Sequence, residues 1–96
     1  MPRLRLKYYD NVWEAVGYPP AEAANLQMRS RLIMALEDII SERRLTQKDA
    51  AKVLGVSQPR ISDLVRGRID KFSLDALIQM LHRAGYTVSL TLKSAA

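Results

Sequence analysis

The side chains best suited to binding chemistry lie near the start of a helix predicted over residues 58–65. They share the face of that helix that its apolar residues leave free: Gln58, Pro59, Ser62 and Asp63. Hydrogen-bonding side chains at the start of an exposed helix suit the major groove of DNA, where donors, acceptors and methyl groups distinguish the base pairs. Gln58 is the best candidate for a base contact, because an amide can bind adenine through two hydrogen bonds. Pro59 offers apolar surface to a thymine methyl.

Basic side chains surround this face. The formal net charge is +5 and the pI is about 9.9, which favours an anionic partner. Lysines and arginines concentrate between residues 43 and 71, at Arg43, Arg44, Lys48, Lys52, Arg60, Arg66, Arg68 and Lys71. Those predicted to contact DNA phosphates are Lys48, Arg66 and Arg68. Arg60 can reach a guanine or a phosphate, with a slight preference for the phosphate.

Asp63 admits several interpretations. Its carboxylate can accept a hydrogen bond from a cytosine amine, or it can repel phosphates and so sharpen specificity. The alternative is an ion pair within the chain, with Arg60 or Arg66 as the partner.

The same sequence offers little to catalysis, and we expect neither enzyme activity nor a cofactor. His82 is the only histidine, and its apolar neighbours predict a partly buried packing residue. With no cysteine and no cluster of ligands at metal-binding spacing, we expect no metal site. The lack of cysteine also fits a reducing cytoplasm. No apolar run is long enough to cross a membrane, so we expect a cytoplasmic protein associated with the nucleoid.

Two short helices joined by a tight turn must position the candidate residues. Thr46 and Asp49 have the spacing of a capping box at the start of the first helix, and Gly55 can adopt the positive φ that ends it. Ser57 caps the second helix, and we count it among the candidate DNA-contacting residues. Gly67 ends that helix. The side chains expected to face inward from it are Ile61, Leu64 and Val65.

Longer elements flank this pair. An uninterrupted helix is predicted from about Ala21 to Arg43, and its apolar arc is wider than one core contact needs. The surplus predicts a dimer or partner surface, unless the N-terminal segment covers it. A last helix, capped by Ser73 and ended by Gly85, follows the pair. Its inner face is predicted to comprise Leu74, Leu77, Ile78 and Leu81.

Both ends of the chain alternate in a strand-like way. Tyr86–Leu92 is predicted to be a strand, which needs a partner because a single strand is not stable in water. That partner is either Arg3–Tyr9 or the same strand of a second chain. Arg3–Tyr9 is equally compatible with a disordered basic arm. Between the arm and the long helix lie aromatic residues that we predict to bind a partner, namely Tyr9, Trp13 and Tyr18. The alternative is that Trp13 packs on the core.

Residues 45–67 resemble the helix-turn-helix of the lambda-repressor/Cro-like, or XRE, class of DNA-binding domains. Further segments resemble the HigA-type antitoxin branch of that class: Asn11–Gly17, Thr46–Gln47, Gln58–Leu64 and Phe72–Asp75. The resemblance implies that Gln47 holds a phosphate at the start of the first helix. Asp63 departs from the basic or amide residue often found at its position.

We therefore expect a mainly α, lambda-repressor-like bundle of about five helices with a C-terminal β-strand. Residues 1–19 would form an N-terminal arm with a short helix, which either binds a partner or is associated with the dimer. Residues 20–96 would form the helix-turn-helix DNA-binding domain with the C-terminal strand. The motif predicts a repressor that binds an operator in double-stranded DNA as a homodimer. The resemblance further implies an antitoxin that binds a RelE/HigB-like toxin and autoregulates its operon. The alternative is a stand-alone, phage-like regulator without a toxin. RNA binding is disfavoured, because no exposed aromatic sheet or glycine-rich clamp is evident.

Overall fold

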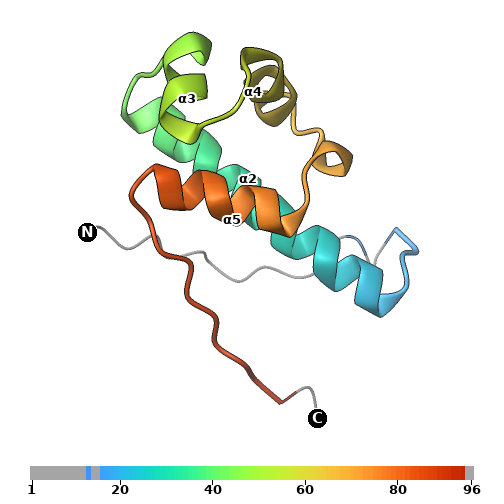
Figure 1. Ribbon diagram of the computed structural model, residues 1–96. Coiled ribbons are helices and arrows are strands. Elements are labelled where there is room, and N and C mark those ends of the chain that lie inside the picture. The colour runs from blue at the N-terminus through green and yellow to red at the C-terminus, as the bar shows by residue number, and fades with distance from the viewer. Residues whose placement is uncertain (1–12, 14–15, 95–96) are drawn as a thin grey trace.

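The computed structural model describes residue 13 and residues 16–94. Within this part of the chain, four α-helices and one 3-10 turn follow one another (Figure 1): α2 (Pro20–Glu42), α3 (Gln47–Leu54), α4 (Gln58–Val65), η1 (Ile69–Lys71) and α5 (Leu74–Arg83). The predictions for Arg3–Tyr9, including Tyr9 as a partner-binding residue, lie outside the described residues.

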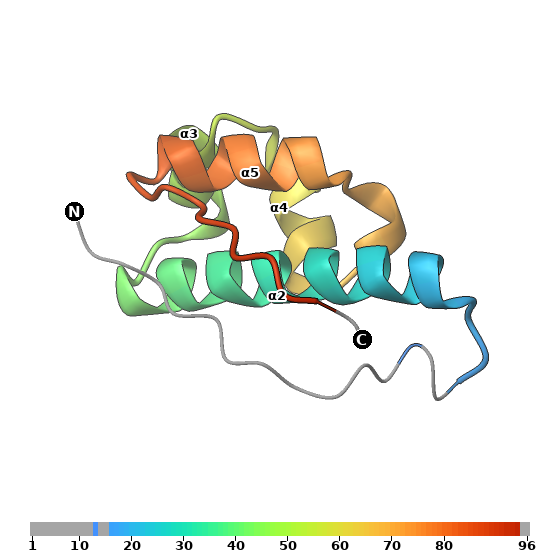
Figure 2. The ribbon, with the colours of Figure 1, turned by 90° about the horizontal axis from the view of Figure 1, so that it is seen from below.

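The long helix α2 is the element on which the others pack. It begins directly after Pro19, with Pro20 at a first-turn position where a missing amide hydrogen costs little. Figure 2 shows α2 and α5 running side by side in the same general direction. The motif helices α3 and α4 pack against each other and against this pair (Figure 1).

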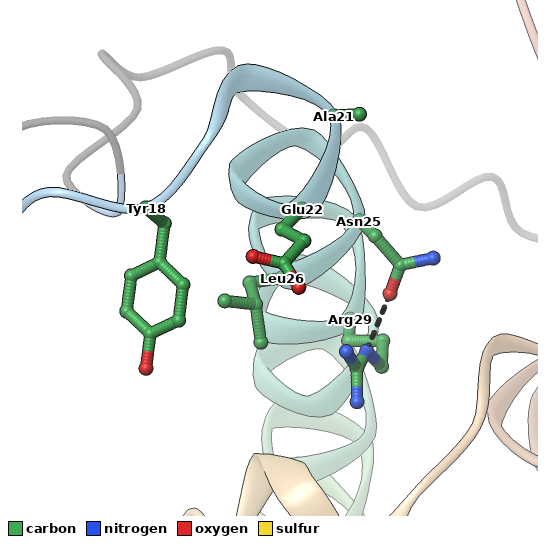
Figure 3. A pocket seen from close by; sticks show the side chains of 6 residues that line it. All are labelled: Tyr18, Ala21, Glu22, Asn25, Leu26 and Arg29. Carbon is green, nitrogen blue, oxygen red and sulfur yellow. Dashed lines mark hydrogen bonds between the residues drawn. The ribbon is translucent and has the colours of Figure 1, made fainter.

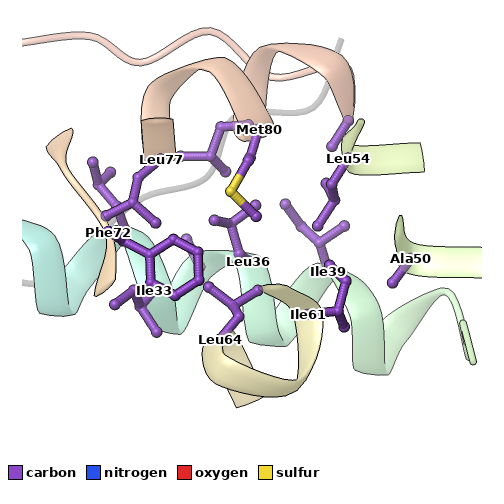
Figure 4. Packing of buried hydrophobic residues seen from close by; sticks show 14 residues of the cluster. Ile33, Leu36, Ile39, Ala50, Leu54, Ile61, Leu64, Phe72, Leu77 and Met80 are labelled. Atoms are coloured by element: carbon purple, nitrogen blue, oxygen red, sulfur yellow. The ribbon is translucent and has the colours of Figure 1, made fainter. Parts of the chain in front are cut away.

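A single apolar core joins all these helices (Figure 4). The largest side chains in it come from every helix and from the loop before α5, and each is at most 2% exposed: Leu32, Leu36, Ile39, Leu54, Ile61, Leu64, Phe72, Leu77 and Leu81. Ala50 on α3 is also fully buried, and its small side chain allows α4 to approach that helix closely. Burial of this apolar surface is the main stabilising contribution to the fold.

The predicted helix caps are confirmed. The Thr46 hydroxyl accepts a hydrogen bond from the amide of Asp49 at 3.1 Å, and the Ser57 hydroxyl accepts one from the amide of Arg60 at 3.3 Å. Ser73 caps α5 in the same way, through the amide of Ala76 at 3.1 Å. Each cap satisfies one of the amides that the first turn of a helix leaves without a partner.

The prediction of a C-terminal strand is wrong for the described chain. Residues 86–94 follow α5 without regular secondary structure, and no strand occurs among the described residues. Alternation of side chains specifies which residues share a face, but a strand also needs a second strand to satisfy its backbone groups. The expected bundle of about five helices is also not supported. Trp13 has helical backbone, but Val16 and Gly17 already form a turn, so the described chain holds four α-helices and η1.

Three side chains lie elsewhere than predicted. Val65 and Ile78, expected to face inward, are each 42% exposed, and His82 is exposed rather than partly buried. Val65 and Ile78 each follow a fully buried leucine, and consecutive helical residues point about 100° apart. The buried face of a short helix is therefore too narrow to include both the leucine and the residue that follows it. Within the described residues, no helix is long and apolar enough to cross a membrane.

Candidate nucleic-acid interface

Helix α4 combines a buried face with an exposed N-terminal end. Ile61 and Leu64 are completely buried in the core, which fixes the rotation of the helix about its axis. Gln58 and Pro59 are both exposed in the first turn, directly after the Ser57 cap. The first turn of α4 thus presents an amide and an apolar ring to solvent on a rigid support.

The turn between α3 and α4 depends on a glycine. Gly55 has φ of +72°, a left-handed conformation that side chains other than glycine rarely adopt. A Cβ atom at this position would also collide with the guanidinium of Arg83 on α5. Because the arginine side chain is flexible, the positive φ is the stronger constraint. The glycine sets the angle at which α4 leaves α3 and therefore the direction in which Gln58 points.

Arg60 makes its contacts within the protein. Its Nη1 donates a hydrogen bond to the carbonyl of Lys71 at 2.8 Å, and its Cζ lies 4.4 Å from the centre of the Phe72 ring. Phe72 is buried, so the guanidinium lies over an aromatic ring that is shielded from solvent. Arg60 therefore connects α4 to η1 and to the loop before α5.

Asp63 pairs with Arg68, and not with the two arginines considered from the sequence. Arg68 Nε lies 3.9 Å from Asp63 Oδ1, and the Arg68 amide donates to the Asp63 carbonyl at 3.1 Å. Both side chains keep access to solvent, so the ion pair contributes little to stability. It does place a positive charge beside the one carboxylate on α4, which reduces the repulsion that Asp63 would exert on a phosphate.

The remaining predicted residues frame the exposed turn of α4. Gln47 and Lys48 are exposed at the N-terminal end of α3, where the helix dipole favours an anion. Ser57 is exposed at the cap, and Ser62 is half-buried one turn along the helix. Arg66 is exposed at the C-terminal end of α4. The helices α3 and α4, which carry these candidates, lie on one side of the molecule (Figure 1). Arg60, Ser62 and Asp63 are less exposed than the other candidates.

Arg29 on α2 and Arg43, which directly follows that helix, have structural roles that the sequence did not indicate. Arg29 Nη1 donates weakly to the carbonyls of Ile69 and Phe72, at 3.4 and 3.5 Å. Arg43 Nη2 donates to the Ala84 carbonyl at 2.7 Å, where α5 ends and its carbonyls lack helical partners. The partners lie 40 to 43 positions away in the sequence, so no local pattern could have revealed them. Part of the basic charge thus stabilises the fold.

A separate hollow lies at the N-terminal end of α2 (Figure 3). Its volume is about 540 Å³, and its lining residues are Tyr18, Ala21, Glu22, Asn25, Leu26 and Arg29. The Arg29 Nε donates to Asn25 Oδ1 at 2.7 Å. Trp13 is half-buried and meets the Tyr18 ring edge-on, with 5.8 Å between the ring centres. The two described aromatic residues predicted to bind a partner therefore lie together.

In the described chain, no group of three or more histidine, cysteine or acidic side chains is arranged so that it could hold a metal ion. One acidic group is perturbed. Partial burial, and secondly the negative charge of Asp38, raises the pKa of Glu37 on α2 above its usual value.

The fold and the exposed first turn of α4 define a helix-turn-helix protein. Residues 18–93 match the family model described as "Helix-turn-helix domain", and the chain belongs to that family. A solved structure named "Putative XRE Family Transcriptional Regulator" is 33% identical in sequence, with a TM-score of 0.70. The alignment covers 79% of this chain and 83% of that one. Among curated proteins, none matches the sequence significantly. The resemblance to XRE-like helix-turn-helix proteins is confirmed, whereas the HigA-type branch stays a prediction.

Proposed function

We propose that this protein is a transcriptional regulator that binds double-stranded DNA with α4 in the major groove. The observation that carries the proposal is the first turn of α4, where Gln58 and Pro59 are exposed while Ile61 and Leu64 bury the opposite face. A helix held in this way can enter a groove without disturbing the core. The family match over residues 18–93 supports the same function.

The contacts divide into two kinds. Gln58 and Pro59 would read base edges, with Ser62 and Asp63 further along the helix. The side chains that would bind phosphates are exposed around them: Gln47, Lys48, Ser57, Arg66 and Arg68. Arg60 instead acts as a positioning residue, because its guanidinium is already bound to the Lys71 carbonyl and stacked on Phe72.

Selection from a pool of random DNA duplexes tests this proposal and identifies the operator sequence in the same experiment. The wild-type protein should enrich one sequence. The Gln58→Ala variant should lose preference at one base pair, by a factor of about 5 to 150, equivalent to about 1–3 kcal/mol. Gln79→Ala is the matched control, because Gln79 is an exposed glutamine on α5. Equal enrichment by Gln58→Ala and wild type would contradict the assignment of Gln58.

We further propose that the regulator is the antitoxin of a toxin–antitoxin pair, with residues 1–19 as a partner-binding segment beside the DNA-binding domain. The resemblance to HigA-type antitoxins supports this role. So does the exposure of Tyr18, which lines the hollow at the start of α2, and of Val16, two residues earlier in the sequence. Exposed aromatic and apolar side chains around a hollow are typical of protein-binding surfaces. Such a regulator would act in the cytoplasm, on the nucleoid.

Co-expression with the product of the adjacent reading frame tests the antitoxin role. A stoichiometric complex that relieves growth inhibition by the neighbour would support it. Trp13→Ala should then weaken the complex more than it weakens DNA binding. Trp13 packs edge-on against the ring of Tyr18, a proposed partner contact, and it is far from α4 in the sequence. A harmless neighbour that forms no complex would leave a stand-alone regulator.

A further inference from the structure

The segment that follows α5 exposes apolar side chains in a regular pattern. Tyr86 and Val88 pack partly against the core, whereas Leu90 and Leu92 are 74% and 94% exposed. All four occupy even-numbered positions, so in an extended chain they share one face. One half of an apolar face is therefore covered by the protein itself, and the other half is open.

The backbone of this segment is also open. Among the described residues, the Tyr86 amide donates a backbone hydrogen bond to the Leu81 carbonyl, and no backbone hydrogen bond involves Thr87–Lys93. A run of unpaired amides and carbonyls in an extended segment is a template for pairing with another strand.

Its position leaves the candidate DNA-binding helices free. The segment lies on the opposite side of α2 and α5 from α3 and α4, as the two views in Figures 1 and 2 agree. A partner that pairs with it would therefore not cover the exposed turn of α4.

The segment is complementary to itself. In an antiparallel pair related by a two-fold axis through Ser89, residue 88 lies opposite residue 90, and residue 86 opposite residue 92. Apolar side chains then meet apolar ones on one face, while Thr87 meets Thr91 and the two copies of Ser89 meet on the other. A register shifted by one residue would place apolar side chains opposite hydroxyls.

The lack of charged side chains in this segment is compatible with its pairing with a second copy. Residues 84–92 contain no charged side chain, so two copies can pair without like charges opposing each other. Lys93 would lie opposite Gly85 of the partner.

We propose that residues 86–92 form a two-stranded antiparallel sheet with the same residues of a second copy, and that this sheet is the dimer interface. Leu90 and Leu92 of each chain then cover Val88 and Tyr86 of the other. The interface would supply the dimer that a two-fold symmetric operator requires. In that respect the inference rests on the proposed function, but the dimer itself forms without DNA.

Single cysteine variants test the pairing and its register, because the natural chain has no cysteine. In Ser89→Cys the two Cα atoms would lie about 4.5–5.5 Å apart, within the span of a disulfide. Oxidation should therefore link two chains covalently. In Thr87→Cys the equivalent residues would be four positions apart along the strands, or roughly 13 Å, and should not link. Thr91→Cys should behave likewise, whereas a mixture of the two threonine variants should form the mixed disulfide.

Light scattering without DNA measures the same association in solution. The wild type should have twice the chain mass of 10.9 kDa, and Leu90→Lys should reduce it to one chain mass. Val65→Lys is the control, because Val65 is an exposed apolar residue of α4 on the other side of the molecule, and it should remain dimeric. Circular dichroism melting verifies that each variant folds.

Two results would overturn the proposal. One is a wild-type monomer in which Ser89→Cys does not cross-link, as expected if residues 86–92 pair with the N-terminal part of their own chain. The other is equal cross-linking of Ser89→Cys and Thr87→Cys, which would exclude this register. Both results are independent of DNA binding, so duplex selection on the same samples distinguishes failure of the interface from failure of the proposed function.

Discussion

Replacing Arg60 with alanine should reveal whether this arginine holds the motif together or contacts DNA. Its basic side chain on α4 predicts a DNA contact from sequence alone. In the structure, its guanidinium bonds the Lys71 carbonyl at 2.8 Å and lies 4.4 Å from the Phe72 ring centre. These contacts predict a loss of stability that simple removal of a surface charge would not cause.

The magnitude follows from the two contacts. A typical hydrogen bond contributes about 1 kcal/mol net, and we use this value, below that of a charged group, because the site is partly exposed. Stacking of the guanidinium on a buried aromatic ring adds about 1 kcal/mol. The expected loss of unfolding free energy is therefore about 2 kcal/mol. For a domain of this size it corresponds to a fall in Tm of about 8–16 °C.

Arg66→Ala is the matched control, since Arg66 is an exposed arginine at the end of the same helix. It should change the unfolding free energy by less than about 0.5 kcal/mol. It should, however, reduce the slope of log binding constant against log salt by about 0.9, because one phosphate contact is lost. Arg60→Ala, assayed at a temperature where it is folded, should leave that slope unchanged.

Calorimetry and fluorescence anisotropy at several salt concentrations measure the two effects separately. If Arg60→Ala kept the wild-type Tm and reduced the salt slope as Arg66→Ala does, Arg60 would be a phosphate contact. The positioning role derived from its contacts would then be refuted.

Three further changes test other parts of the account. Thr46→Ala removes the cap of α3 and should lower the unfolding free energy by about 1 kcal/mol in urea denaturation; an unchanged midpoint would mean that the hydroxyl contributes nothing. Leu64→Ala leaves a cavity in the core and should cost about 2–5 kcal/mol by the same assay, whereas a loss below about 1 kcal/mol would show that the site collapses around the smaller residue. The raised pKa of Glu37 means that folding favours the neutral acid, so its stabilising contribution is present below the ordinary carboxyl pKa and is lost as the pH rises through the raised value. Glu37→Gln should therefore raise Tm at about pH 7 and have a smaller effect at about pH 3, and an effect of equal size at both would contradict the role of ionisation.

The parts of the fold that sequence reasoning could predict are those that depend on near neighbours. The caps at Thr46 and Ser57 each involve an amide three residues later, so the interacting groups are visible in a short stretch of sequence. The left-handed conformation of Gly55 is likewise a local requirement of the turn. Because local geometry dictates these features, the sequence predicts the positions of α3 and α4 closely.

Contacts between distant segments could not be predicted. Arg29 and Arg43 both donate to carbonyls more than 39 positions away. Arg60 posed the same difficulty, because its partner Lys71 lies beyond the end of α4. A sequence identifies a basic residue as a possible phosphate ligand. Only the packing of the helices and loops reveals whether its side chain already donates a hydrogen bond to a carbonyl of the protein.

The prediction of a strand in the C-terminal segment was wrong for a different reason. The alternation of Tyr86–Leu92 predicted a strand, but in the structure only Tyr86 and Val88 pack on the core, whereas Leu90 and Leu92 are exposed. Whether such a segment is a strand depends on a second strand, and the described part of a single chain does not contain one. The pattern therefore indicates an interface more directly than it indicates a secondary structure.

The most direct test of the central claim is a nuclear magnetic resonance titration of the isotope-labelled protein with its selected duplex. The largest amide shift changes should occur in the first turn of α4, around Gln58, and at Gln47 and Lys48 at the start of α3. The amides of residues 86–92, on the opposite side of the molecule, should change little. Changes confined to residues 86–92 or to the hollow at the start of α2 would contradict the assignment of α4 as the DNA-reading helix.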